Sequence, residues 1–340
     1  MKRLLKFLIA LFLLLAVVFF LGAYLLPDRA RISRQVRIDR PAGQVFAVVN
    51  DLHRFNEWSP WFDLDPSATY RHEGPERGAG SALHWSGNDA AGSGTLRIVS
   101  SEAPSRVETE VAFEGFPDPA RALLLISGDG DASRVEWTFE TALNGPLARW
   151  FGLLMPRYIG ADYDKGLGRL KTLVESGPDV DFSDLEVADM TTSAFDAIVA
   201  DGEVPAGDMD AAAATLGDLY GRLLAFAAAQ DLEIIGQPLT LTSEPGAATW
   251  RFQAALPVRV AGAVQESEGV GLLRIPASRA FVIEHVGPYD GLDAAMVKLD
   301  AYVTAQGLRR AGPIRSVYVS DPGDTAADER VTRIVCPLAE

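Results

Sequence analysis

The hydrophobic residues of this chain begin with one continuous run near the N-terminus. Residues 7–26 contain no charged side chain, and as a helix rising about 1.5 Å per residue they cross a hydrocarbon core of about 30 Å. A secretory signal peptide is the alternative, but its apolar region usually covers only about 7–15 residues. No convincing small-x-small cleavage site follows, although Gly22-Ala23 leaves cleavage possible. We therefore predict an uncleaved anchor over residues 1–30, with residues 4–26 in the membrane.

The charges on either side of this run disagree about its orientation. Lys2, Arg3 and Lys6 precede it and favour a cytoplasmic N-terminus, whereas the arginines within residues 29–40 argue for the reverse. A large C-terminal domain is translocated largely regardless of nearby charge. We expect a single-pass protein with its N-terminus inside and its globular part periplasmic or otherwise extracytoplasmic.

After the anchor the pattern changes to a period of two, which is typical of half-buried strands. Residues 32–38 alternate in this way, and residues 41–48 read as a short helix that begins at a proline. Gly128 to Asp131 is a turn signal between two later strands. Further strands are expected at hairpin spacing over residues 81–85, 94–100, 106–113, 122–127 and 133–143.

A helical period follows the strands. Tyr163, Leu167, Leu170 and Val174 fall at the spacing of one helix face. Pro156 is expected to break or kink the earlier part of this helix. An opening strand, a short helix, an antiparallel run and a long closing helix together predict a helix-grip fold.

The last part of the chain is duplicated. Residues 229–258 and 305–338 each read as the end of a helix, a Gly-Pro turn and two strands that end in a proline. A unit this small cannot bury its own apolar face, so the copies are expected to pair around a shared seam. Loops are expected over residues 202–208 and 260–269. The expected buried stripes of the two helices are Leu216, Leu219, Tyr220, Leu223 and Leu224, and Leu292, Met296, Leu299 and Val303.

Particular residues in the first part resemble a known superfamily. Trp58-Ser59-Pro60-Trp61, Trp85-Ser86-Gly87-Asn88 and residues 166–171 are similar to the polyketide-cyclase and START-related superfamily. The resemblance covers residues 31–176 and implies an antiparallel sheet around a long C-terminal helix, with an apolar cavity between them. Its members have many functions, so the fold does not select one.

The duplicated part resembles a second family. His285-Val286-Gly287-Pro288-Tyr289, Val317-Tyr318 and Asp321-Pro322 are similar to the gyrase-inhibitor-like, or AraC-type effector-binding, domain. The resemblance covers residues 184–340, after a polar linker over residues 177–183, and implies small-molecule binding in a cleft between two βαββ repeats. We therefore predict an α+β protein with a transmembrane helix, a helix-grip domain and a duplicated βαββ domain.

Charge and residue usage exclude several kinds of site. The formal net charge is −15 in 340 residues, and an acidic protein repels nucleic-acid phosphates, so we predict no nucleic-acid partner. Cys336 is the only cysteine, and none of the four histidines forms an H-x-x-x-H pair, so we predict no metal. Nothing in the sequence indicates a cofactor or a defined set of catalytic residues.

Aromatic residues are the strongest candidates for binding. In the first domain we select Trp85 and Trp137, although most such residues are core. In the second domain the alternation of Trp250 and Phe252, together with Tyr289 and Tyr318 of the other repeat, predicts an aromatic pocket across the seam.

Charged and polar neighbours adjust this prediction. Glu284 and His285 point to opposite faces of a strand, so they are not expected to form a dyad; support of the following Gly-Pro turn is the simpler role for His285. Many relatives carry a glutamate where this chain has Ser316, beside Arg315. A pocket without that carboxylate is expected to prefer uncharged or anionic amphipathic molecules over cations. Glu284 and Ser316 complete the candidate ligand-binding residues.

The sequence thus predicts a membrane-tethered protein that binds small hydrophobic or amphipathic molecules, or lipids, in apolar pockets, and senses or sequesters them. A hydrolase or cyclase that uses Tyr289, Tyr318 and Glu284 is one alternative. A protein-interaction module is the other.

Overall fold

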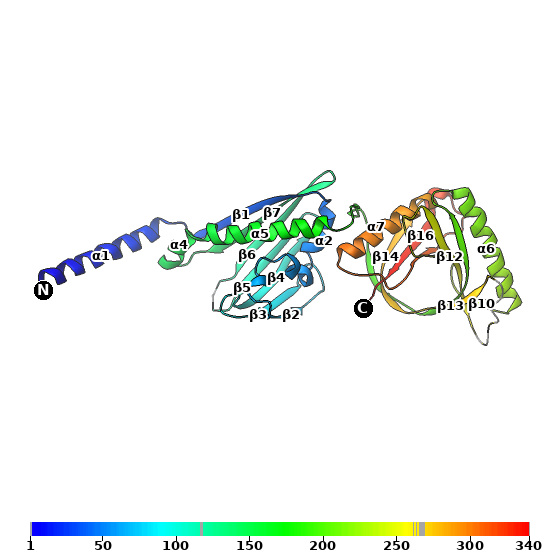
Figure 1. Ribbon diagram of the computed structural model, residues 1–340, viewed down its shortest axis with the longest axis horizontal. Coiled ribbons are helices and arrows are strands. Elements are labelled where there is room, and N and C mark those ends of the chain that lie inside the picture. The colour runs from blue at the N-terminus through cyan, green and yellow to red at the C-terminus, as the bar shows by residue number, and fades with distance from the viewer. Residues whose placement is uncertain (1, 116–117, 261, 263, 265–268, 340) are drawn as a thin grey trace. The chain divides into compact units, whose positions relative to one another are not determined.

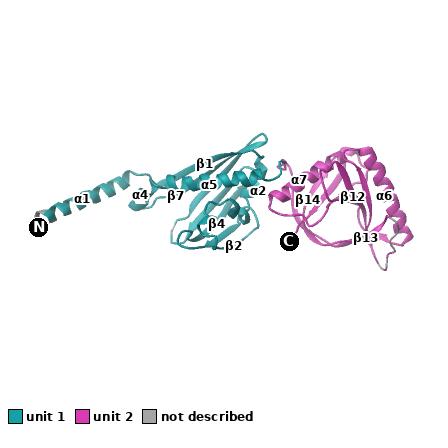
Figure 2. Ribbon diagram, in the orientation of Figure 1, with its two compact units in different colours: residues 1–179 teal, residues 180–340 magenta. Residues whose placement is uncertain are grey.

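The computed structural model of the protein describes the chain apart from residues 1, 116–117, 261, 263, 265–268 and 340. It contains two compact units, residues 1–179 and residues 180–340 (Figure 2). Each unit has its own antiparallel sheet. The units are described separately below.

The first unit begins with the apolar run, which forms the helix α1 (Lys2–Leu25). Within it Lys6–Leu25 is long and apolar enough to cross a membrane, with a mean hydropathy of 2.9, and only 6% of that stretch is buried by the rest of the protein. An apolar helix left this exposed needs an apolar environment. A membrane span and a signal sequence both meet this description.

A seven-stranded antiparallel sheet forms most of the first unit, in the order β1-β7-β6-β5-β4-β3-β2 (Figure 1). The strands predicted from alternation are all present. The edge strand β2 is largely exposed, so it lacks the alternation that would have revealed it. The strands are β1 (Arg29–Ile38), β2 (Thr69–Glu73), β3 (Ala82–Ser86), β4 (Ser93–Glu102), β5 (Arg106–Phe113), β6 (Ala120–Asp129) and β7 (Ala132–Ala142).

The long helix α5 (Met155–Glu175) lies along this sheet (Figure 1). The predicted stripe is buried: Tyr163, Leu167, Leu170 and Val174 are 0–4% exposed. Pro156 lies in the first turn of α5, where a missing N–H costs nothing, and a separate helix, α4 (Pro146–Gly152), ends before it. The other helical segments are α2 (Ala42–Val49), α3 (Phe55–Trp58), α4 (Pro146–Gly152), and the short 3-10 turns η1 (Leu52–Arg54) and η2 (Phe62–Leu64).

The second unit is built from two βαββ repeats, β9-α6-β11-β12 and β14-α7-β15-β16. They meet at the pair β11–β15 in the middle of a curled sheet of order β13-β9-β12-β11-β15-β16-β14-β8, with β10 paired to β12. This pair is the predicted seam. The elements are β8 (Ala188–Thr192), β9 (Phe195–Pro205), α6 (Met209–Ala229), β10 (Glu233–Ile234), β11 (Leu239–Thr242), β12 (Thr249–Arg259), β13 (Gly271–Ile275), β14 (Ser278–Val286), η3 (Tyr289–Gly291), α7 (Leu292–Ala305), β15 (Ile314–Tyr318), η4 (Ala327–Glu329) and β16 (Val331–Pro337).

Most of the predicted apolar stripes hold. The four residues named on α7 are 0–8% exposed, and on α6 Leu219 and Leu223 are buried. Leu224 is 51% exposed. Leu219 and Leu223, four residues apart, face the sheet, and Leu224, directly after Leu223, is turned away from it.

The predicted loop over residues 202–208 is only partly correct, since β9 continues to Pro205. Gly202 looks like a breaker but lies within this strand, because the ring of Phe252 occupies the space where a Cβ would be. The loop predicted over residues 260–269 falls largely outside the described residues.

Candidate ligand-binding site

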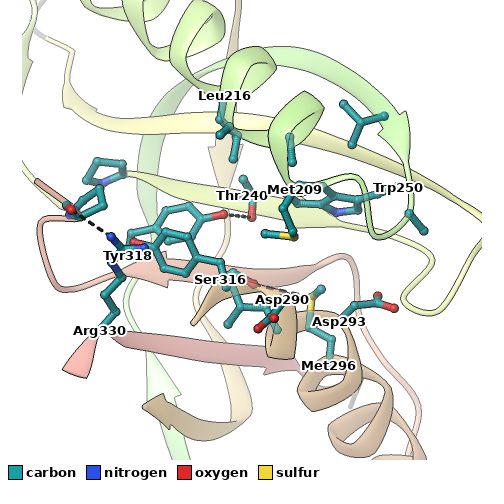
Figure 3. A pocket seen from close by; sticks show the side chains of 18 of the residues that line it. Met209, Leu216, Thr240, Trp250, Asp290, Asp293, Met296, Ser316, Tyr318 and Arg330 are labelled. Carbon is teal, nitrogen blue, oxygen red and sulfur yellow. Dashed lines mark hydrogen bonds between the residues drawn. The ribbon is translucent and has the colours of Figure 1, made fainter. Parts of the chain in front are cut away.

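A cavity of about 980 Å³ lies over the β11–β15 seam in the second unit. Its lining comes from both repeats: α6, β11 and β12 from the first, and α7, β15 and the loop after β15 from the second. Figure 3 shows these side chains pointing toward one another from the two halves. We call this space the seam cavity; its volume lies in the range of cavities that hold drug-sized molecules.

Its floor is neutral and hydrogen-bonded. Thr240 and Ser316 are paired across the seam, so both side chains point to the helix side of the sheet, and both are almost fully buried. The Tyr318 hydroxyl lies 3.2 Å from the Thr240 hydroxyl. The Ser316 hydroxyl donates to the Met296 sulfur at 3.6 Å. These polar groups are satisfied within the floor, so the surface offered to a ligand is mainly apolar.

Two tyrosines form one wall. The rings of Tyr289 and Tyr318 meet edge to face with centroids 5.4 Å apart, and the Arg330 guanidinium lies 5.1 Å from the centre of the Tyr289 ring. Burial raises the pKa of Tyr318 to about 12. Burial likewise raises the pKa of Tyr289, although Arg330 opposes the shift. Both phenols are therefore neutral at ordinary pH and offer aromatic faces and hydrogen bonds rather than a base.

The opposite wall is built on Trp250. Its indole stacks on Phe252 with centroids 4.1 Å apart, and its Nε1 donates to the Thr242 hydroxyl at 3.0 Å. Both contacts fix the indole ring, so its free face lies toward the cavity and the side chain needs no further ordering when a ligand binds. Phe252 is 4% exposed and supports Trp250 from below, and it does not line the cavity.

The mouth of the cavity is acidic. Its carboxylates are exposed, and three of them also hold backbone: Asp208 accepts from the Ala211 N–H, Asp293 from the Gly246 N–H and Asp321 from the Gly323 N–H. Arg330 is the one cationic residue of the described lining. A mouth of this charge repels anions, which argues against the expected tolerance of anionic ligands. The carboxylates of the lining are Asp208, Glu244, Asp290, Asp293 and Asp321.

Glu284 lies outside the seam cavity. Its carboxylate is exposed and accepts from Arg333 at 3.1 Å. His285 is turned the other way, and its Nε2 donates to the Pro288 carbonyl at 3.0 Å. The ring thus holds the Gly287-Pro288 turn that leads to Tyr289. As expected from strand alternation, the two side chains form no dyad.

The candidates of the first unit pack within their own domain. Trp137 stacks on Tyr163 with centroids 3.7 Å apart and is 4% exposed. Trp58 and Trp61 contact Trp137 edge to face, so aromatic rings occupy this part of the space between the sheet and α5. Trp85 donates from Nε1 to the Ala91 carbonyl at 3.2 Å and so closes a hairpin.

Some residues that line the cavity were not predicted from the sequence. Thr240 was not selected from the sequence, and Met296 was assigned to the buried stripe of its helix. Arg330 lies in a loop, where no hydrophobic periodicity marks it. Tyr220 was read as part of a buried stripe, but it also lines the cavity and donates to the Leu239 carbonyl at 2.9 Å. Within the described part of the chain, no group of three or more His, Cys, Asp or Glu side chains is arranged to hold a metal ion.

Two family models match the chain. Residues 29–175 match the family of polyketide cyclase/dehydrase and lipid transport proteins, and residues 191–339 match the GyrI-like small molecule binding domain. The chain joins a polyketide-cyclase-type domain to a GyrI-like domain. This confirms the predicted resemblance and the predicted α+β fold, in which an apolar N-terminal helix precedes the helix-grip domain and the duplicated GyrI-like domain. Both families include binders of small molecules or lipids by description.

Solved structures resemble parts of the chain. An EcmrR–DNA complex matches at a TM-score of 0.41 and 17% identity, over 58% of this chain and 73% of that one. The EcmrR C-terminal domain matches at 0.37 and 18%, over 46% and 98%. A hydrolase from Listeria innocua matches at 0.34 and 15%, over 45% and 91%. Similarity at this level says nothing about activity. No protein of curated function matches the chain.

The prediction that nucleic acid is not a partner was wrong. A structure that matches part of this chain was solved as a complex with DNA. The acidic charge of a whole chain averages over all its surfaces, and DNA contacts depend on the local distribution of charge. The net charge of the chain therefore does not exclude a nucleic-acid partner.

Proposed function

We propose that this protein is a membrane-tethered small-molecule-binding protein whose ligand occupies the seam cavity of the GyrI-like domain. The observation that carries the proposal is the seam cavity itself, with Trp250 on one wall and Tyr289 and Tyr318 on the other. These rings are already fixed by stacking and hydrogen bonds, so binding costs little side-chain entropy. The family description of the domain supports the same function.

The lining also favours a class of ligand. The neutral floor of Thr240 and Ser316 and the aromatic walls suit an apolar or aromatic body. The carboxylates at the mouth suit a neutral or cationic end that remains near solvent. Exposed carboxylates are screened by salt and contribute about 0–1 kcal/mol each, so the apolar body supplies most of the affinity. We therefore propose amphipathic ligands that are neutral or weakly cationic, whereas the sequence predicted uncharged or anionic ones.

The hydrolase or cyclase alternative has less support. Its base would have to be Tyr289 or Tyr318, but burial raises the pKa of both phenols. Glu284, the other group in that hypothesis, pairs with Arg333 away from the cavity. We therefore assign the seam cavity to binding.

Titration of the purified full-length protein with matched neutral, cationic and anionic fluorescent dyes tests the proposal. We expect the neutral and cationic dyes to bind at one site with similar affinity and the anionic dye to bind more weakly. Native mass spectrometry of the same preparation should show a bound small molecule. Dyes that show no saturable binding, with no copurified ligand, would overturn the assignment.

Tethering by α1, with the globular part outside the cytoplasm, is the second half of the proposal. Its support is the length, apolarity and exposure of Lys6–Leu25. The membrane fraction should retain the full-length chain through an alkaline carbonate wash, whereas a cleaved signal sequence would release it. An intact C-terminal alkaline phosphatase fusion without activity would place the globular part in the cytoplasm.

A further inference from the structure

An exposed apolar surface lies in the segment of the chain that comes after β7, the last strand of the first unit. It consists of α4 and the start of α5, residues 146–158, and contains large side chains that contact little else in the protein. Patches of this kind on a soluble surface mark contact with a partner or a membrane. The exposed fractions are 75% for Leu147, 55% for Phe151, 55% for Leu153, 50% for Leu154 and 61% for Tyr158.

This segment is fixed to the last turns of α1. The Trp150 ring stacks on Phe19 with centroids 6.3 Å apart, and its Nε1 donates to the Phe19 carbonyl at 3.0 Å. Gly22 makes the contact possible, since a Cβ there would lie 2.5 Å from the indole. α4 and α1 are neighbours in Figure 1.

Arg149 closes the end of α1. Its Nη1 donates to the Ala23 carbonyl at 3.1 Å and to the Leu26 carbonyl at 3.3 Å. The last carbonyls of a helix have no partner within the helix and carry partial negative charge, so a guanidinium satisfies and stabilises them. α4 is thereby held at the C-terminal end of α1 by both its aromatic and its basic side chain.

The position of this contact along α1 sets its depth. Phe19 precedes Leu25, the end of the apolar helix, by a little under two turns, or about 9 Å. The headgroup region on each side of a bilayer is only about 5–8 Å thick, from about 40–45 Å in total less about 30 Å of hydrocarbon. When α1 spans the membrane, a segment packed against Phe19 therefore cannot lie wholly outside the bilayer.

We propose that residues 146–158 form a second membrane-contacting surface, which lies in the interfacial layer of the bilayer beside α1. The proposal rests on the proposed tethering by α1. Trp150 and Tyr158 are residues that favour this layer, and the aliphatic stem of Arg149 carries its charge to the polar C-terminal end of α1. The consequence is that the helix-grip domain is held against the bilayer by two elements instead of swinging on one.

Depth-dependent fluorescence quenching tests this in the full-length protein, reconstituted in phosphatidylcholine–phosphatidylglycerol vesicles. An environment-sensitive label is placed at Phe151→Cys and, as the matched control, at Asp131→Cys in the β6–β7 turn, at the opposite end of β7. Cys336 is fully buried, so the wild type controls for unwanted labelling. We expect the label at position 151 to lie about 5–10 Å into the boundary between headgroups and acyl chains and to be quenched by nitroxide-bearing acyl chains, with the label at position 131 unquenched.

A substitution in α1 separates this surface from the tether. Gly22→Leu keeps the span apolar but removes the space for Trp150, so quenching at position 151 should fall while the chain stays on the vesicles. Val18→Leu, on an exposed face of α1, should leave it unchanged. A chain that stays bound through carbonate but shows equal quenching at positions 151 and 131 overturns the second surface alone. Release of the chain by carbonate overturns the tether and the second surface together.

Discussion

Replacing Ser316 by glutamate places a carboxylate in the floor of the seam cavity, and Ser316→Gln is the neutral control of the same size. Ser316 is 1% exposed and lies beneath Met296, whose flexible thioether can move aside. A bound cation about 4 Å from the new carboxylate gains about 4 kcal/mol at an effective dielectric constant near 20. Desolvation of both charges offsets most of this gain. We expect a net gain of about 1–2 kcal/mol, or roughly tenfold tighter binding of a cationic dye.

The pH dependence adds a second signature. Burial raises the pKa of a carboxyl group, so the carboxyl introduced by Ser316→Glu ionises only as the pH rises above that raised value. Affinity for the cationic dye should therefore increase with pH in Ser316→Glu and stay flat in Ser316→Gln, and a neutral dye should not distinguish the two. Fluorescence titration across pH measures both effects. Equal affinity of the two variants for the cation at every pH would mean that the dye does not reach this floor.

Other predictions test the walls, the protonation states and the division of the chain. Trp250→Ala should weaken neutral dye binding about tenfold, since it removes a stacked wall, and Trp250→Phe should lose less; a dye titration measures both. The pKa of Tyr318 is raised from 10.0 to about 12 in the folded protein, so its contribution to stability is complete below about pH 10 and is lost as pH rises toward 12. Tyr318→Phe should therefore flatten the fall of Tm in that range; an unchanged slope would contradict the raised pKa. Fragments 31–176 and 179–340 should each unfold cooperatively in calorimetry, and a fragment without a transition would show that it depends on the other.

Regular periodicity explains which parts of the fold were predictable. The stripe from Tyr163 to Val174 and the duplicated Gly-Pro turns are local patterns, and they led to the closing helix and to the β11–β15 seam. The resemblance carried by residues 285–289 located the Tyr289 wall. Trp250 was found because strand alternation places it on the same face as Phe252.

The remaining features depend on contacts distant in sequence. Glu244 and Arg330 reach the mouth of the cavity from loops and Asp290 from the single turn η3, and no periodicity shows where such short segments will place a charge. We expected anionic ligands to be tolerated because of Ser316 and Arg315, and the charged residues at the mouth could not be included in that argument. Likewise, the contact of Trp150 with Gly22 joins residues more than a hundred positions apart, and neither residue is unusual in its own segment.

The central claim is that the ligand occupies the seam cavity, and two glycines of α6 allow a matched test. Gly217 lines the cavity and Gly221 does not, yet a Cβ at either position meets no atom within 4 Å. Both substitutions also replace a helical glycine, so they share the same gain in helix propensity. Binding of the neutral dye by Gly217→Trp and Gly221→Trp should therefore differ through occupation of the cavity alone. We predict that Gly217→Trp binds at least about tenfold more weakly than wild type, or about 1.4 kcal/mol, and that Gly221→Trp binds as the wild type does; wild-type affinity in a folded Gly217→Trp variant would contradict the assignment.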